Sequence, residues 1–339
     1  MDLRSIREQA KVRLKGYCRV CPVCDGRACA GEVPGMGGTG TGAAFQANLE
    51  ALKKYRLHMR TLHDAKDPDT GCCLFGEKLH TPILAAPMTG TIYNMGGVIP
   101  EREFLGMLIT GSRQAGSIGF TGDAPDRYIF EAGLEAIKAE QGWGIPIIKP
   151  RAQEVLIRMV KEAEAAGALA VGVDVDGAGL ITMALKGQPV GPKTMEELRE
   201  IISATTLPFI VKGIMTVDEA VTAAMAGAKA IVVSNHGGRS LDHTPGAADV
   251  LPDIAREVGG RITILADGGV RSGVDALKLL ALGADAVLVG RPLVIGAFGG
   301  GTAGVKFIIE KFTQELKQAM ILTGCRSLAD IDTRILYTG

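Results

Sequence analysis

The chain has 339 residues, and its 37 Lys and Arg balance 37 Asp and Glu, so its formal net charge is zero. This balance indicates no basic face, and it excludes nucleic acid from the expected partners. Hydrophobic residues make up 47% of the chain, which is enough for a sizeable core, and the length suits a single α/β barrel.

The amino terminus is charged and lacks the apolar region of a signal peptide. Gly and charged residues interrupt every apolar stretch, so we expect no segment able to cross a bilayer and no membrane partner. The seven cysteines are odd in number and crowd toward the amino terminus, unlike a secreted disulfide framework. These features predict a cytoplasmic protein.

Residues 1–80 differ in pattern from the rest of the chain. They contain a short helix candidate, the crowded cysteines, a glycine-rich stretch at 35–42 and a second helix candidate around 43–55. No Ser- or Pro-rich linker follows, so we interpret 1–80 as a Cys-rich, helical extension packed on a main domain at 81–339.

Four cysteines of this extension, Cys18, Cys21, Cys24 and Cys29, have the spacing C-x2-C-x2-C-x4-C. Closely spaced thiolates are the ligands of iron–sulfur clusters and of structural zinc. The spacing is similar to a compact ferredoxin-type run without reproducing it, whereas zinc usually takes two separated pairs. We therefore predict a metal site here, iron–sulfur or zinc, with free cysteines as the alternative.

From about residue 80, short apolar runs alternate with longer segments of helical periodicity. The runs, typical of parallel strands buried on both faces, lie at 82–87, 117–122, 145–150, 168–175, 208–213, 230–235, 262–268 and 286–292. Helices are predicted at 153–167, 216–228 and 272–284, where Thr or Ser can cap the start of the last two. Eight such units without a hairpin signature predict a (β/α)8 TIM barrel. A doubly wound open sheet is the alternative, but its GxGxxG fingerprint is absent near the start.

Polar residues follow the last two predicted strands, where a barrel of this kind binds phosphate. Asp267, Gly268, Gly269 and Arg271 follow one strand, and Gly290 and Arg291 follow the other. Glycines let backbone N–H groups approach an anion, and arginines hold phosphate oxygens in pairs, so these residues predict a phosphate site. Asp267 could accept hydrogen bonds from a polyhydroxyl chain or cap the next helix.

Other polar side chains end the three preceding strands. His236 can take a proton from a hydroxyl group, and Arg239 can hold a carboxylate with two hydrogen bonds. Asp174 could orient the imidazole and favour its charged form. Lys212 could stabilise negative charge on a reduced cofactor ring, or form a salt bridge with Asp174 or Asp267.

Four segments together resemble the FMN-dependent 2-hydroxy-acid oxidase and dehydrogenase family, which includes glycolate and lactate oxidases. They are FIVKG (209–213), VVSNHGGRSLDHTPGAADVLPDI (232–254), ADGGVRSGVDALKLLALGADAVLVGRP (266–292) and LTGCRSLADI (322–331). The resemblance is strong from about residue 205 and weaker but collinear across 45–175.

The resemblance implies FMN as cofactor, a 2-hydroxy acid as substrate and a role for each matching residue. His236 would be the catalytic base, Arg239 the carboxylate clamp, Asp174 the partner of the imidazolium and Lys212 the lysine near flavin N1. The implied flavin contacts are Pro87, Met88, Thr89, Lys149, Lys212, Ser234, His236, Gly237, Asp267, Gly268, Gly269, Arg271, Gly290 and Arg291. By family analogy the protein would be a homo-oligomer, in this case a tetramer.

The substrate side departs from the family. Lys149 and Arg151 replace a Gln-x-Tyr, Val175 and Asp176 replace a Thr-Pro, and the long lid after the fourth strand is missing. Lys149 would hold the flavin pyrimidine, and Arg151 and Tyr17 would contact substrate. An iron–sulfur centre would pass single electrons to an acceptor protein and make the chain a dehydrogenase. The alternatives are a non-oxidative enzyme similar to FMN-dependent isopentenyl-diphosphate isomerase, and a flavin- or metal-dependent electron-transfer or sensor protein.

Overall fold

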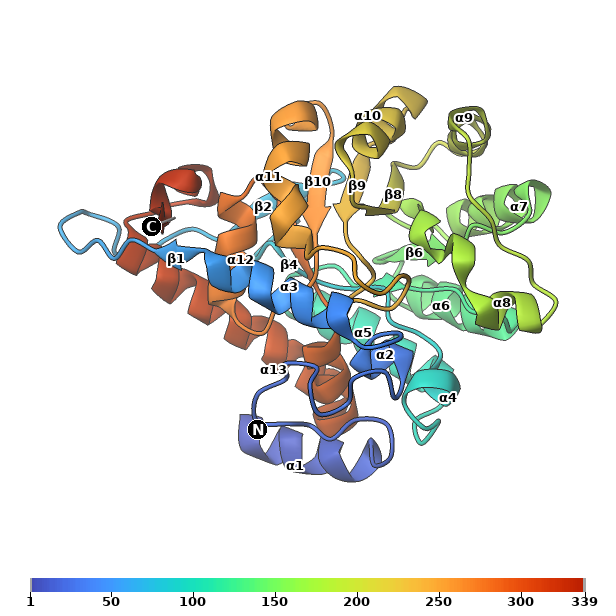
Figure 1. Cartoon of the computed structure of the whole chain (residues 1–339), viewed down its shortest axis with the longest axis horizontal. Helices are drawn as coiled ribbons and strands as arrows, with labels where there is room; N and C mark the ends of the chain where they lie inside the picture. The colour runs from blue at the N-terminus through green and yellow to red at the C-terminus, as the bar shows by residue number, and fades with distance from the viewer. Residues whose placement is uncertain (1, 338–339) are drawn as a thin grey trace.

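The structure is a computed structural model that describes residues 2–337, and its centre is an eight-stranded parallel sheet curled into a barrel (Figure 1). The strands are β4 (Ile83–Ala85), β5 (Phe120–Thr121), β6 (Ile145–Ile148), β7 (Val171–Asp174), β8 (Phe209–Ile214), β9 (Ala230–Val233), β10 (Thr263–Ala266) and β11 (Ala286–Val289). Seven lie inside predicted apolar runs and β8 extends one residue beyond its run at 208–213, so the predicted (β/α)8 barrel is confirmed.

The strands form in these runs because both faces of the sheet are covered. Every residue of β6, β7, β8, β9 and β11 is buried, inside by barrel side chains and outside by helices. The sheet order runs from β4 through β11 down to β5, and a parallel bridge from Ala85 to Gly119 joins the two ends. All the strand carboxyl ends therefore open on one side of the molecule.

Helices surround the barrel (Figure 1). They are α4 (Thr91–Asn94), α5 (Glu101–Gln114), α6 (Arg127–Ala139), α7 (Gln153–Ala165), α8 (Ile181–Leu185), α9 (Met195–Ser203), α10 (Val217–Ala226), α11 (Ala247–Val258), α12 (Gly273–Ala281) and α13 (Arg291–Thr323), with 3-10 turns η1 (Val175–Gly179), η2 (Leu328–Asp330) and η3 (Thr333–Ile335). The predicted helices match α7, α10 and α12. Thr216 and Ser272 cap the last two by accepting backbone N–H groups, as expected.

The amino-terminal extension packs against the barrel at several points. It contains α1 (Leu3–Arg13), α2 (Pro34–Gly37), α3 (Ala43–Lys54) and β1 (Arg56–Leu57). Helix α1 packs on α13 and α3 packs on α11, while β1 pairs with β12 (Leu336–Tyr337) near the end of the chain. In Figure 1, α3 crosses in front of the barrel close to α2 and α12.

A short antiparallel hairpin, which the sequence patterns did not predict, closes the amino end of the barrel. Strands β2 (Cys72–Leu74) and β3 (Glu77–Leu79) are joined by Phe75 and Gly76, both with positive φ, as a tight two-residue hairpin turn requires. Leu74 and Leu79 pack against barrel-filling side chains such as Phe120 and Leu288. The hairpin has only three residues per strand, too few for alternation to be recognised in the sequence.

The expectation that no segment is long and apolar enough to cross a bilayer is wrong for α13. This helix has 33 residues and a window of mean hydropathy 1.5, which meets both criteria. Half of that window is buried inside the protein, however, against α1, α5 and α12. Gly301 also interrupts the helix with φ of 60°. Packing in the core therefore accounts for its composition.

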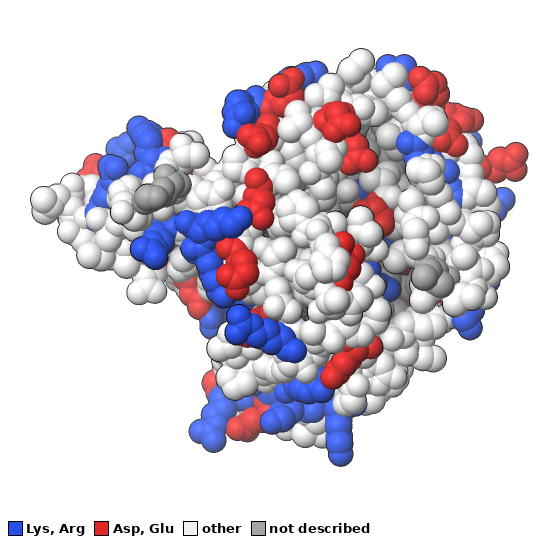
Figure 2. Space-filling view, viewed as in Figure 1, with Lys and Arg blue, Asp and Glu red and all other residues white. Residues whose placement is uncertain are grey.

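Charged side chains of both signs are interspersed on the face of the molecule drawn in Figure 2. On the face drawn in Figure 2, basic residues of α1 and α3 lie beside acidic ones. The mixture of basic and acidic side chains on this face agrees with the equal numbers of the two kinds of residue in the sequence.

Candidate active site

The strand order places the predicted catalytic residues side by side at the carboxyl ends of the barrel. Asp174 is the last residue of β7 and pairs in register with Lys212 of β8. His236 lies three residues beyond β9, and Asp267 directly follows β10. These side chains, remote in sequence, therefore meet at one mouth.

Asp174 is the centre of a buried ion network. Lys212 Nζ donates a hydrogen bond of 3.0 Å to its Oδ1, and Lys149 donates to its Oδ2. Burial alone would raise the pKa of Asp174, but the charges of His236, Lys149 and Lys212 hold the pKa well below its usual range. Burial likewise opposes the charge of Lys212, but the nearby carboxylates raise its pKa above the ordinary value. The salt bridge between Lys212 and Asp174 is thus present.

His236 faces two carboxylates through the same ring nitrogen. Its Nδ1 lies 3.1 Å from Oδ1 of Asp176 and 3.5 Å from Oδ2 of Asp174. Its backbone has φ of 59°, a left-handed conformation that an Asn or a His adopts more readily than most residues. Because carboxylates accept at Nδ1, this nitrogen carries the proton and Nε2 remains free to accept another.

Asp176 is therefore the nearest carboxylate partner of the imidazole, where the sequence had indicated Asp174. The physical reason is that Lys149 and Lys212 occupy both oxygens of Asp174. Ligand atoms of Asp174, Asp176 and His236 lie within 4.8 Å of one another, as in some metal sites. The two lysines already compensate Asp174, so we interpret the three residues as an acid–base group.

Burial, before any other cause, lowers the pKa of His236 below the ordinary 6.5, although Asp174 and Asp176 oppose this effect. The imidazole is therefore neutral, and able to accept a proton, at neutral pH. We expect kcat/KM for flavin reduction to rise with pH as His236 loses its proton, with an apparent pKa below 6.5, and then to level off. Stopped-flow measurements from about pH 5 to 8 test this; a rate that falls as pH rises would contradict it.

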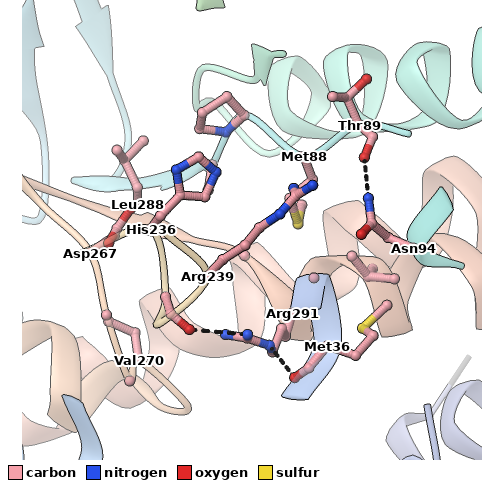
Figure 3. Close-up of a pocket in the computed structure, with 18 of the residues that line it drawn as sticks. Met36, Met88, Thr89, Asn94, His236, Arg239, Asp267, Val270, Leu288 and Arg291 are labelled. Carbon is pink, nitrogen blue, oxygen red and sulfur yellow. Dashed lines mark hydrogen bonds between the residues drawn. The ribbon is translucent and has the colours of Figure 1, made fainter. Parts of the chain in front are cut away.

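Arg239 extends into the cavity at the barrel mouth toward Met88 (Figure 3). It also lines a second cavity of about 1220 Å³ with His236, Lys149 and Tyr93. Burial lowers its pKa, and Asp174 and Asp176 oppose the shift. Within residues 2–337 no carboxylate lies at salt-bridge distance from Arg239, so its guanidinium is available to an anionic ligand.

Two predicted substrate residues lie elsewhere. Arg151 is buried and forms a bidentate salt bridge with Asp123, at 2.8 Å to each carboxylate oxygen. Its positive charge is therefore neutralised by Asp123. Tyr17 packs beside Gly96, and in the described part of the chain neither residue lines the two cavities at the mouth. Asp123 carries no sequence signal that would have identified it as the partner of Arg151.

Lys149 lines the second cavity, yet its ammonium group is held by Asp174. Tyr93, which the sequence did not single out, lines the same cavity and donates its hydroxyl to Asp126. This contact, before burial, raises the pKa of Tyr93 to about 12.

A cavity of about 820 Å³ between β4, β10 and β11 has the lining expected of a flavin site. Asp267 lies in it, and among the described residues its buried Oδ1 has no hydrogen-bond partner. Gly268 follows with φ of 99°, and a Cβ there would lie 2.4 Å from Oδ1 of Asn48. The backbone can therefore take this path only with glycine.

Arg271 and Arg291 close one end of this cavity. Both stack on the ring of Phe45 from α3, with Cζ at 5.5 Å and 4.1 Å from the ring centroid. Burial first, and then the charge of Arg271, lower the pKa of Arg291 to about 9. Nη2 of Arg271 is buried without a partner in the part of the chain described. Two neighbouring half-buried guanidinium groups would suit a dianion.

The remaining predicted flavin contacts are found in or beside the same cavity. Pro87, Met88 and Thr89 line it after β4, and Thr89 donates to the buried Glu101. Gly237 and Gly290 also line it, whereas Ser234 is buried and accepts the backbone N–H of His236. FMN fits this donor set: the arginines would hold its phosphate, and Asp267 would accept hydrogen bonds from its ribityl hydroxyls.

The four cysteines of the extension come together in space. All four line one cavity beside α13, and they are free thiols. Arg291 lines this cavity as well as the flavin cavity.

The comparisons with known proteins agree with this geometry. The model of the FMN-dependent dehydrogenase family matches residues 35–184 and 181–338. The chain is 32% identical to an L-lactate oxidase of Nostoc sp., over 89% of this chain and 92% of that one, and 32% identical to a 2-hydroxyacid oxidase of Dictyostelium discoideum, over 86% and 81%. It is also similar to a crystal structure of mandelate oxidase with (S)-2-phenylpropionate, with a TM-score of 0.77, 30% identity and coverage of 99% and 97%.

The chain therefore belongs to the FMN-dependent dehydrogenase family, and its cofactor is FMN. The family match begins at residue 35 and so leaves Cys18 to Cys29 outside it.

Proposed function

We propose that the chain oxidises a 2-hydroxy acid to the 2-oxo acid at the barrel mouth. The observation that carries this proposal is the shared cavity of His236 and Arg239. An imidazole fixed by Asp176 and a guanidinium that forms no salt bridge within residues 2–337 face the same space there. The relatives named as L-lactate and 2-hydroxyacid oxidases support the same substrate class.

Each side chain has a distinct task in this reaction. Arg239 binds the substrate carboxylate with two hydrogen bonds and so directs the hydroxyl toward His236. Nε2 of His236 removes the hydroxyl proton, and Asp176 stabilises the charge that the imidazole gains. FMN, when bound, accepts the two electrons of the substrate. Lys212, which also lines the flavin cavity, offsets negative charge there.

The second cavity favours a substrate with a substantial side chain. It extends beyond His236 and Arg239 to Leu180 and Met183, which offer apolar contacts. Because Lys149 is already paired with Asp174, it does not call for a second negative charge on the substrate. A 2-hydroxy acid with an aliphatic or aromatic side chain fits this lining best.

For reoxidation of the flavin we propose a one-electron acceptor protein in the cytoplasm, with the chain acting as a dehydrogenase in a homo-oligomer. The crowded thiols beside the flavin phosphate end, an arrangement suited to an iron–sulfur centre, support this direction. The non-oxidative alternative is disfavoured because a carboxylate clamp such as Arg239 has no use in an isomerase of diphosphates.

An anaerobic screen tests the proposed reaction. The holoprotein is mixed with glycolate, lactate, 2-hydroxyisocaproate and mandelate, and flavin absorbance is followed. We expect bleaching, with kcat/KM greater for the two larger acids than for glycolate because they fill the apolar end of the second cavity. If no 2-hydroxy acid reduces the flavin, the proposal is wrong; equal rates for all four would remove only the side-chain preference.

A further inference from the structure

The four cysteines of the extension line one cavity, whose other walls include Leu14, Met36, Val294 and Arg291. They come from a loop between α1 and α2, and none is paired in a disulfide. Cys72 and Cys73 both lie in strand β2 of the hairpin at the amino end of the barrel, and they do not line this cavity. The loop thus gathers four thiols on one buried space and leaves the others outside it.

The spacing of these thiols decides which metal they suit. A single tetrahedral zinc ion brings four sulfurs to about 3.8 Å from one another, because each lies roughly 2.3 Å from the metal. Across residues 2–337, however, no three cysteine sulfurs fall within a mutual 4.8 Å. A polynuclear cluster binds each thiolate through a different metal atom, and it therefore takes sulfurs that lie further apart than those around one zinc ion.

The cavity also has a cationic wall. Arg291 lines it together with the four cysteines, and Arg271 donates to the backbone oxygen of Cys24. These two guanidinium groups would compensate the negative charge of a four-thiolate cluster.

The backbone of the loop between α1 and α2 also directs an N–H group at one of the cysteine sulfurs. Val20 has φ of 49°, which is unfavourable for a β-branched residue, and its N–H points to Sγ of Cys18 at 3.4 Å. Arg7 of α1 fixes this turn by donating to the carbonyl oxygens of Val20 and Cys21, at 3.2 and 2.5 Å. Hydrogen bonds to ligand sulfurs are among the contacts that set the potential of iron–sulfur centres.

From these observations we propose that Cys18, Cys21, Cys24 and Cys29 bind an iron–sulfur cluster of the four-iron type next to the phosphate end of the flavin. Arg291 lines both cavities and Arg271 donates to the backbone oxygen of Cys24, so the two centres share their cationic wall. The site lies before the residues that the family model matches and is therefore an addition to the family's barrel.

The role of the cluster rests on the proposed function. Oxidation of one 2-hydroxy acid releases two electrons and two protons. An iron–sulfur cluster would take one electron at a time and no proton, so it would be reduced and reoxidised twice per substrate, and a one-electron carrier protein would receive both electrons. The protons leave to solvent, one of them through His236.

Metal analysis of the protein purified and reconstituted without oxygen tests the site before any substrate is added. We expect roughly four iron and four acid-labile sulfide per chain, and a paramagnetic signal after reduction by dithionite. The double variant C21S/C29S should lose at least nine-tenths of the iron and sulfide. Cys73→Ser, which changes an exposed cysteine outside the loop, should keep both.

The outcomes separate the cluster from the proposed reaction. Zinc without sulfide, or neither metal after reconstitution of the unaltered chain, overturns the cluster even if a 2-hydroxy acid bleaches the flavin. Iron and sulfide with no bleaching leave the cluster in place and overturn the reaction. Because the unaltered chain supplies the deciding measurement, poor folding of the double variant does not obscure the result.

Discussion

Replacing His236 by Asn lowers the rate of anaerobic flavin reduction by about 10²- to 10⁴-fold, the usual contribution of a general base. Nε2 of His236 is the only proton acceptor that the proposed reaction assigns, and the Asn side chain cannot replace its basicity. Asn tolerates the left-handed backbone at this position, where φ is 59°, so the loop should keep its shape. The flavin spectrum of the variant should show FMN still bound.

His243 provides a matched control for this substitution. It has almost the same backbone, with φ of 60°, but its side chain is exposed and lies outside both cavities in the region described. His243→Asn should leave the rate of flavin reduction within twofold. If His236→Asn reduces flavin as fast as His243→Asn, His236 is not the base.

Asp174→Asn should mainly reduce stability and Asp176→Asn should mainly slow flavin reduction, although both carboxylates face the same imidazole. Asp174 compensates two buried lysines, so its loss should lower the free energy of unfolding by about 3–5 kcal/mol. Asp176 contacts His236 and Ser240 at the edge of the site, so Asp176→Asn should fold but reduce flavin about 10²- to 10⁴-fold more slowly.

The pH dependence distinguishes the two effects. Asp176 raises the pKa of His236, so removing its charge should move the rise in kcat/KM to lower pH. Denaturant unfolding and stopped-flow reduction measure the two properties separately. A strongly destabilised Asp176→Asn with an unshifted pH profile would show that this carboxylate is structural.

Much of the barrel and of the flavin site could be predicted because the sequence pattern that indicates each of them lies within short segments of the chain. Continuous apolar runs mark strands buried on both faces, and the strand ends of a barrel converge wherever the runs are placed. Asp267, Arg271 and Arg291 follow directly from this rule, since their position after β10 or β11 defines their place in space.

The pairing of charges could not be predicted in the same way. Asp174 and Asp176 are two residues apart, and only the three-dimensional positions of Lys149 and Lys212 decide which carboxylate is free for His236. Arg151 was assigned to substrate because Asp123, on a different βα unit, gives no sign of facing it. The position of Tyr17 beside Gly96 and the packing of the hairpin at 72–79 on the barrel likewise depend on contacts between segments far apart in the chain.

The pair of guanidinium groups stacked on Phe45 has a thermodynamic consequence. Without a dianion, Arg271 and Arg291 repel each other in a half-buried site, and this repulsion destabilises the apoprotein until the flavin phosphate binds. A ligand at 1,000 times its Kd stabilises the folded state by about 4 kcal/mol. Since Phe45 belongs to α3, flavin binding should secure the extension as well as the barrel, and cofactor supply then limits how much folded protein a cell accumulates.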